Sequence, residues 1–421
     1  MDKRDFLKKF SLLSISVLPG TAALSHLIDE MDEATLDQLI TDEDFWLKIR
    51  AGFRLNPAYT NLENGYYCIL PEETLEHYLA HVREVNFLGS YYMRKLMTDN
   101  HTIVRQKLAN LAGCSTDELI ITRNTTESLD SIISGYPWKK GDEAIMSHQD
   151  YGAMLDMFRS VKERYQIVTK FISLPNHPKS DEEIVDLYRN QITKKTKLIL
   201  VCHIININGH VLPIRKICDM AHELGVEVMV DGAHAFAQLD FKIPDLNCDY
   251  YGASLHKWLG APLGCGLLYV RKEKISKIWP LLAAEVLPLD SIDRLNHTGT
   301  KPVHVDLCIS NAIDYHLAIG AKRKENRLKF LKKYWVDQIK DNKKIQINTP
   351  FEEERSSAIV NVLVIGMTPQ EMATRLLEEF KIWTVAINNE AVKGCRITPS
   401  IYTTTAELDL LVGALRKICG E

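Results

Sequence analysis

Short hydrophobic runs alternate with amphipathic stretches through the middle of the chain. Between about Glu118 and Val270, seven strand-like apolar runs are separated by amphipathic segments. Regular alternation of this kind predicts a mostly parallel sheet covered by helices. The seven predicted strands are Leu119–Thr122, Glu143–Ser147, Gln166–Ile172, Leu198–His203, Val226–Asp231, Tyr250–Ser254 and Cys265–Val270.

The flanks of this region are patterned differently. Helix-like, polar-rich segments dominate from Glu30 to Leu111, and a long helical pattern runs from Asp306 to about Lys340. Asn348–Ser357, with its proline and its run of charges, predicts a surface connection. We expect a large α/β domain over residues 29–305 and a smaller α/β C-terminal domain over residues 306–421, with which the N-terminal helical segment could also pack. Further strands and helices are predicted at Ser357–Ile365, Glu371–Phe380, Ile382–Ile387, Gly394–Thr398 and Glu407–Cys419.

The composition narrows the class of function. The 421 residues are 46% hydrophobic and 25% charged, which is ordinary for a globular protein. The formal net charge is −4 with both signs interspersed, so no basic stripe predicts nucleic-acid binding, and small-molecule chemistry is favoured. The nine cysteines form no Cys-x-x-Cys pair and have no histidine beside them at metal-ligand spacing. We therefore predict buried, reduced thiols and no metal site.

The N-terminus resembles an export signal. Lys3 and Arg4 precede an apolar run from Phe10 to Leu24 that is too short, and too broken by Pro19, to span a bilayer as a helix. The pattern is similar to a twin-arginine signal in which Lys3 replaces the first arginine. It predicts a signal over residues 1–28, a periplasmic protein and no membrane anchor after processing. The alternative is a docked N-terminal helix on a cytoplasmic protein.

Asp231 ends a predicted strand as a carboxylate in an apolar run. A buried carboxylate needs a cationic partner. The pyridinium nitrogen of pyridoxal phosphate (PLP) is such a partner, and keeping that nitrogen protonated makes the ring an electron sink. Alternatively, Asp231 caps a following helix.

Lys257 stands twenty-six residues after Asp231, just beyond the strand Tyr250–Ser254. In an apolar setting, desolvation lowers the pKa of a lysine, so that the amine can act as a nucleophile and then carry a proton. A solvated surface lysine is the alternative, since lysines are mostly exposed. The spacing to Asp231 favours the reactive interpretation.

A cluster of hydroxyl and amide side chains over Asn124–Ser128 joins the first predicted strand to a probable helix that runs through Ile133. The free N–H groups and the positive dipole at a helix start bind phosphate. The same residues could equally form an ordinary Asn/Thr helix cap.

These elements, in this order, resemble the class V aminotransferase family of fold-type I PLP enzymes, and in particular its isopenicillin N epimerase-like members. The resemblance runs from about Asn61 to Lys417 and includes the phosphate loop, the aspartate strand, the Ser-x-His-Lys turn and a C-terminal arginine. It implies a fold-type I PLP-transferase with a mostly parallel seven-stranded sheet. It also implies that Lys257 forms the Schiff base with PLP, that Asp231 pairs with the pyridine nitrogen, and that His234 lies near the 3-oxygen.

The resemblance also assigns the phosphate group. Its cup would be Thr125, Thr126, Ser254 and His256, with Thr300 reaching in from a neighbouring subunit. The last assignment implies a homodimer with a shared active site.

Three further residues follow from the same resemblance. Tyr151 would cover the PLP face, although core packing is an alternative for this ring. Asn206 would contact the 3-oxygen or the substrate. Arg396 would clamp the substrate α-carboxylate, a task that suits a planar guanidinium, with a surface ion pair as the alternative.

Two departures from the family pattern limit the reaction. Lys381–Lys393 contains no cysteine, and Cys395 lies in a strand-like run, which disfavours a cysteine-persulfide desulfurase. Relatives often carry an asparagine where this chain has Thr403–Thr405, so substrate contacts there are open.

The predicted function is PLP-dependent chemistry at the α-carbon of an amino acid or amine, a small-molecule substrate. An epimerase or racemase is the first hypothesis, by analogy with the family members that the chain resembles. A class V aminotransferase or a C–S lyase is the alternative within the family. A PLP-binding protein without turnover is the alternative of another class.

Overall fold

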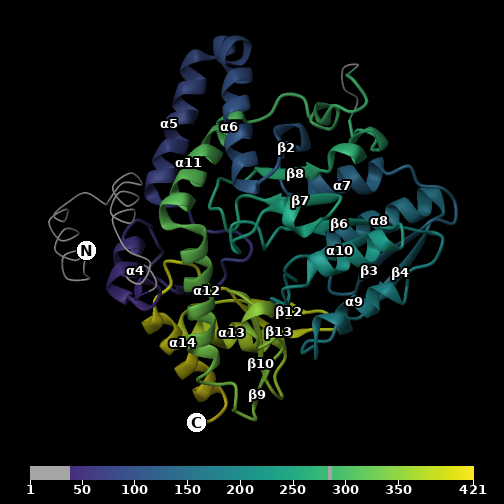
Figure 1. Ribbon diagram of the computed structural model, residues 1–421. Helices are drawn as coiled ribbons and strands as arrows, with labels where there is room; N and C mark the ends of the chain where they lie inside the picture. Colours follow the sequence, from purple (N-terminus) through teal and green to yellow (C-terminus); the bar gives the residue numbers. More distant parts are fainter. Residues whose placement is uncertain (1–37, 283–286) are drawn as a thin grey trace.

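The computed structural model describes residues 38–282 and 287–421 (Figure 1). The predicted export signal over residues 1–28 lies outside the described residues. Within the described part of the chain, no helix has the length and apolar character needed to cross a bilayer.

A seven-stranded sheet forms the centre of the molecule (Figure 1). Its order is β2-β8-β7-β6-β5-β3-β4, and only β8 runs against its neighbours. All seven predicted strands are therefore confirmed, and so is the mostly parallel sheet. The strands are β2 (Leu119–Thr122), β3 (Glu143–Ser147), β4 (Val168–Ile172), β5 (Thr196–Cys202), β6 (Glu227–Asp231), β7 (Tyr250–Ser254) and β8 (Gly266–Val270).

Alternate residues of these strands point into two separate hydrophobic cores. On one face the sheet packs against α7 (Thr125–Gly135) and α8 (Gly152–Tyr165). On the other face it packs against α9 (Asp181–Arg189) and α10 (Ile214–Glu223). Because both faces are covered, the strands other than the edge strand β4 read as mostly apolar runs, which is why they could be predicted to within about two residues.

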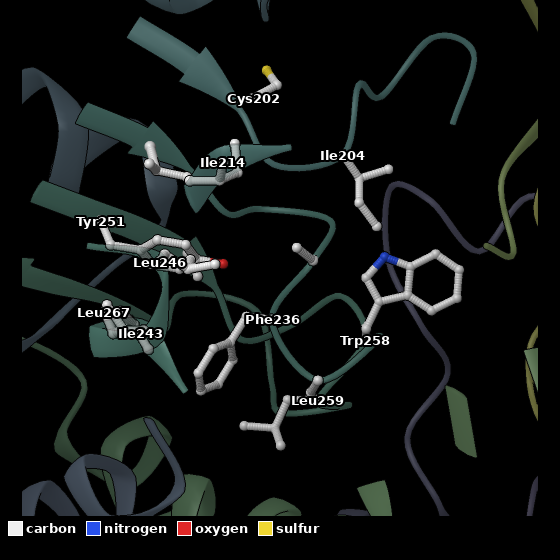
Figure 2. Packing of buried hydrophobic residues seen from close by; sticks show 14 of the residues in the cluster. Cys202, Ile204, Ile214, Phe236, Ile243, Leu246, Tyr251, Trp258, Leu259 and Leu267 are labelled. Carbon is white, nitrogen blue, oxygen red and sulfur yellow. The ribbon is translucent and has the colours of Figure 1, made fainter. Parts of the chain in front are cut away.

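The second core continues beyond the strand ends into the loops that carry the site. Figure 2 shows Tyr251 on β7 and Leu267 on β8, with Phe236 and Trp258 in the loops that follow β6 and β7. Both loop residues are almost completely buried. The loops are thus anchored by packing, so the polar residues between these anchors are held in fixed places.

The predicted helical flanks form a cluster beside the sheet. The long pattern after Asp306 is two helices, α11 (Val303–Ile319) and α12 (Ala321–Val336), because Gly320 adopts φ 87° and ends the first. α11 packs against α5 (Glu72–Leu88) and α6 (Met97–Ala112).

The N-terminal helix α4 (Glu43–Arg50) contacts the C-terminal part of the chain. Arg50 donates two hydrogen bonds of 2.8 Å to the carboxylate of Glu407, at the start of α14 (Thr405–Ile418). Arg327 of α12 forms an ion pair with Glu43 at 2.6 Å.

A smaller, antiparallel sheet lies toward the C-terminus, in the order β12-β13-β10-β9 (Figure 1). β9 was not predicted. A separate pair, β1 with β11, joins the N-terminal segment to this region. The elements are β9 (Ile345–Ile347), β10 (Val360–Val364), α13 (Pro369–Phe380), β12 (Val385–Asn388), β13 (Lys393–Ile397), β1 (Thr60–Asn61) and β11 (Ile382–Trp383).

The prediction that Asn348–Ser357 is a surface connection was wrong at both ends. Asn348, Thr349 and Ser357 are buried, and only the middle of the segment is exposed. Thr349 Oγ1 donates to the carbonyl of Asn208 at 2.5 Å, and Asn348 Nδ2 donates to Asn361 Oδ1 at 2.8 Å. The side chains of Asn348 and Thr349 are thus paired with distant residues, which composition does not reveal.

Candidate active site

A cavity of about 460 Å³ opens at the carboxyl ends of β5, β6 and β7, where ligands bind in sheets of this kind. The start of α7, one residue of β13 and the segments 65–66 and 263–264 also line it. All of the predicted site residues except Thr300 line it, namely Thr125, Thr126, Tyr151, Asn206, Asp231, His234, Ser254, His256, Lys257 and Arg396.

Lys257 is partly buried in the wall of this cavity, which rules out a solvated surface lysine. Burial is the main cause that lowers the pKa of its amine to about 8, and the nearby Arg396 acts in the same direction. Asp231 acts in the opposite direction. The amine therefore has a substantial neutral, nucleophilic fraction near neutral pH.

His234 fixes the position of that amine. Its Nε2 lies 3.0 Å from Lys257 Nζ, while its Nδ1 accepts a 3.4 Å hydrogen bond from Trp258 Nε1. Burial and the adjacent Lys257 hold the pKa of His234 well below its ordinary value, so the ring is neutral. A neutral ring that accepts at Nδ1 carries its proton on Nε2, and this N–H then donates to the lysine nitrogen.

Asp231 ends β6 and is 4% exposed. Its Oδ1 accepts the N–H of Ala233 at 3.0 Å within a turn, and the next helical segment begins only at Ile243. The helix-cap alternative is therefore wrong. Burial raises the pKa of Asp231, while the Ala233 N–H and Lys257 oppose this shift. Its carboxylate needs a cation at the cavity side.

The start of α7 is a helix cap that also faces the cavity, and its role in binding phosphate stays a prediction. Asn124 caps the helix, because its Oδ1 accepts the N–H of Glu127 at 2.8 Å. The next residue, Thr125, donates its N–H to Ser254 Oγ at 2.9 Å, and the two hydroxyls lie 2.7 Å apart. The cap thus orients the helix start, and the pair of hydroxyls faces the cavity with Thr126.

Arg396 is held in a buried ion pair that the sequence did not predict. Its Nε and Nη2 donate to Glu63 Oε2 and Oε1 at 3.2 and 2.5 Å, and its Nη1 donates to the carbonyl of Asn206 at 3.1 Å. The surface-pair alternative is wrong, because both side chains are buried. Sequence reasoning missed Glu63, since a glutamate in a polar N-terminal segment carries no motif.

The matched family model is that of the class V aminotransferases, and it covers residues 71–411. The chain belongs to the class V aminotransferase family. This family is PLP-dependent, and the chain is a PLP-dependent enzyme.

Proteins that are similar to this chain are named after different reactions. Isopenicillin N epimerase from Streptomyces clavuligerus is 26% identical over 399 residues, which cover 89% of this chain and 99% of that protein. A probable cysteine desulfurase from Synechocystis sp. is 25% identical over 374 residues, covering 82% and 86%.

Solved structures share the fold at lower identity. The apo cysteine desulfurase of Thermococcus onnurineus NA1 has a TM-score of 0.78 at 20% identity and covers 88% of this chain and 97% of its own. A cystine C–S lyase in complex with cysteine persulfide has a TM-score of 0.78 at 21% identity, covering 86% and 97%. These likenesses confirm the predicted fold class.

The cavity fits PLP. Asn206 Oδ1 and His256 Nδ1 are buried there without a hydrogen-bond partner, so both are available to a polar ligand. Asp231 supplies the anion that a pyridinium nitrogen requires, and the α7 start supplies donors for a phosphate. Tyr151 is 46% exposed at the cavity, so plain core packing is wrong for it.

Thr300 does not line the cavity that holds the other predicted site residues. It lines a second cavity, of about 600 Å³, together with residues of α6. A role at the phosphate group of a neighbouring subunit stays a prediction.

The cysteines of this class V chain are all free thiols, and eight of the nine are buried, as predicted. Cys395 lies on β13, where burial raises the pKa of its thiol to about 12. Burial also raises the pKa of Cys202, in the cavity wall, well above its ordinary value. Neither thiol has the thiolate character of a nucleophile.

Within the Thr403–Thr405 stretch, Thr404 caps α14, because its side chain accepts a hydrogen bond from the N–H of Glu407.

Among residues 38–282 and 287–421, no group of three or more His, Cys, Asp or Glu side chains is arranged to hold a metal ion.

Proposed function

We propose that this enzyme moves a proton at the α-carbon of an amino acid, as an epimerase or racemase. PLP, held by Lys257 and Asp231, would supply an electron sink for the pair left when a bond to the α-carbon breaks. The observation that carries the proposal is a lysine of lowered pKa, 3.0 Å from a neutral histidine, in one cavity with an aspartate and an arginine.

Each residue has a task that its surroundings support. Asp231 would hold the ring nitrogen in its protonated form, because a buried carboxylate stabilises a cation beside it. Lys257 Nζ would hold the cofactor and then take the α-proton, which requires a neutral amine; epimerisation follows when the α-carbon is reprotonated on its opposite face. Arg396 would orient the substrate carboxylate.

The epimerase assignment is supported by relatives that align over nearly the whole chain under that name. A C–S lyase is the second candidate, because other relatives of similar identity are named cysteine desulfurases. A persulfide route would need a reactive cysteine, and the raised thiol pKa values of Cys202 and Cys395 oppose it. Elimination from a sulfur-containing substrate needs no enzyme thiol.

Incubation of the holoenzyme with L- and D-amino acids in deuterated water distinguishes these reactions. We expect deuterium at the α-carbon without keto acid. Keto acid with an aminated cofactor would indicate transamination, and pyruvate with released sulfur would indicate C–S lysis. A protein that holds PLP but exchanges no α-proton with any amino acid would contradict the enzymatic proposal.

Lys257→Ala should remove both the exchange and the visible absorbance band of lysine-bound PLP. The matched control is Lys332→Ala. Lys332 is also buried with a pKa lowered to about 8 by burial, but it donates to Ser356 Oγ at 2.7 Å, outside the cavity. The band and the exchange should persist in that variant.

A further inference from the structure

The predicted carboxylate-binding group is already paired within the protein. Every nitrogen of the Arg396 guanidinium donates to an acceptor of the chain, two to the Glu63 carboxylate and one to the Asn206 carbonyl. Only two of its five N–H donors are left for a ligand. A substrate carboxylate would therefore meet a guanidinium whose charge is already neutralised.

The position of Glu63 is built into the fold. Glu63 forms a parallel bridge with Thr398, on the segment that follows β13. Its Oε1 also accepts the N–H of Tyr66 at 3.0 Å. A Cβ on Gly65 would lie 2.9 Å from Arg396 Cζ, so the backbone there lies close against the guanidinium. The Glu63–Arg396 pair is thus held in place by the Thr398 bridge, the Tyr66 hydrogen bond and the nearby Gly65 backbone.

Two carboxylates on one guanidinium repel each other, and the burial of Arg396 and Glu63 weakens the screening of their charges. An incoming carboxylate must then displace Glu63 from Arg396. The exchange replaces one ion pair with another and loses the Tyr66 hydrogen bond, so a lone carboxylate gains little.

An amino acid is in a different situation, because its amine is anchored at the cofactor beside Lys257. Both Arg396 and Glu63 lie within electrostatic reach of Lys257 Nζ. A carboxylate delivered by an anchored amine competes with Glu63 at high effective concentration.

We propose that Glu63 is a specificity-determining residue. In the free enzyme Glu63 pairs with Arg396, and it is displaced only by the carboxylate of a molecule that is also anchored through its amine. The substrate class is then an α-amino acid, and free monocarboxylates are excluded. This inference rests on the proposed role of Arg396 in the reaction.

The test is calorimetric titration of the holoenzyme with propionate, a carboxylate without an amine. We expect weak binding to the unaltered protein and about tenfold tighter binding to Glu63→Gln, since the amide removes the competing charge but keeps the side-chain shape. Propylamine, which lacks the carboxylate, should bind both proteins alike.

Arg396→Gln separates the failure of this inference from the failure of the proposed function. If Arg396→Gln abolishes propionate binding but Glu63→Gln binds no tighter than the unaltered protein, Glu63 only positions Arg396 and the inference is overturned. If Arg396→Gln, also in the Glu63→Gln background, leaves propionate binding intact, Arg396 is not the carboxylate site and the proposed function loses its substrate clamp.

A matched control is Glu407→Gln, which breaks the two-bond pair with Arg50 outside the cavity. Glutamine keeps the capping box at the start of α14, so the propionate affinity should stay unchanged. If Glu63→Gln fails to fold, Glu63→Asp provides the test, because a shorter carboxylate pairs less well with Arg396. That variant should also bind propionate more tightly, and equal or weaker binding would overturn the inference.

Discussion

At the scale of the residue, the chemistry depends on the protonation of one amine. A lysine with its ordinary pKa near 10.5 has only about one neutral amine in a thousand at pH 7.5, whereas a pKa of about 8 leaves about a quarter neutral. Burial produces this shift, and the N–H on His234 Nε2 favours the neutral form by donating to it.

The rate at which apoprotein takes up PLP should follow the deprotonation of Lys257. Neutral amine increases as the pH rises, so the rate should climb through about pH 8 and then level off. Stopped-flow absorbance after mixing apoprotein with PLP measures this rate. A rate that still rises about tenfold between pH 8.5 and pH 9.5 would indicate an ordinary lysine instead.

At the scale of the element, the site depends on how closely α7 approaches the sheet. Gly266 begins β8, beneath the loop that caps α7. An added Cβ there would lie 2.7 Å from Asn124 Cα and 2.8 Å from the carbonyl oxygen of Ala253, both of them backbone atoms. The absence of a side chain thus lets the cap and the Thr125–Ser254 pair reach the cavity.

Gly266→Ala should therefore move the α7 start away from the phosphate position. We expect a loss of about 1–3 kcal/mol in the free energy of unfolding, as for other overpacked sites, together with weaker PLP binding. Urea denaturation and PLP titration measure the two effects. Gly152→Ala is the control, because nothing lies within 4 Å of an added Cβ at that exposed helix start. Unchanged PLP affinity in Gly266→Ala would show that the loop has room to adjust.

At the scale of the whole molecule, the cavity of a single chain is open to solvent. Tyr66 and Leu263 line it and are 75% and 56% exposed, which is unusual for large apolar side chains at a reaction site. Thr300 lies at a different cavity of the same chain. Both features are consistent with the predicted homodimer, in which a neighbouring subunit would complete the site.

Co-expression of two inactive variants tests this arrangement. If Thr300 serves the neighbouring subunit, a chain with Lys257→Ala can supply Thr300 to a chain with Thr300→Ala, whose lysine is intact. Mixed dimers should then regain part of the exchange activity that each variant lacks alone. No recovery, with mixed dimers verified by mass, would place Thr300 outside the site.

The seven central strands and the polar residues at their ends could be predicted from the amino-acid pattern alone. Strands buried on both faces are continuous apolar runs, and the ends of parallel strands share one edge, so Asp231 and Lys257 had to lie close together. The helix break at Gly320 and the strand β9 were missed, because local pattern marks them weakly.

The pairing of the charges at the site could not be predicted, because it depends on contacts between distant segments. Glu63 and Arg396 are 333 residues apart in the chain, and their pairing depends on how the N-terminal segment lies against β13. The orientation of His234 between Trp258 and Lys257 likewise depends on how two loops pack. Such contacts follow from the packing of distant segments, which no local pattern of hydrophobic and polar residues specifies.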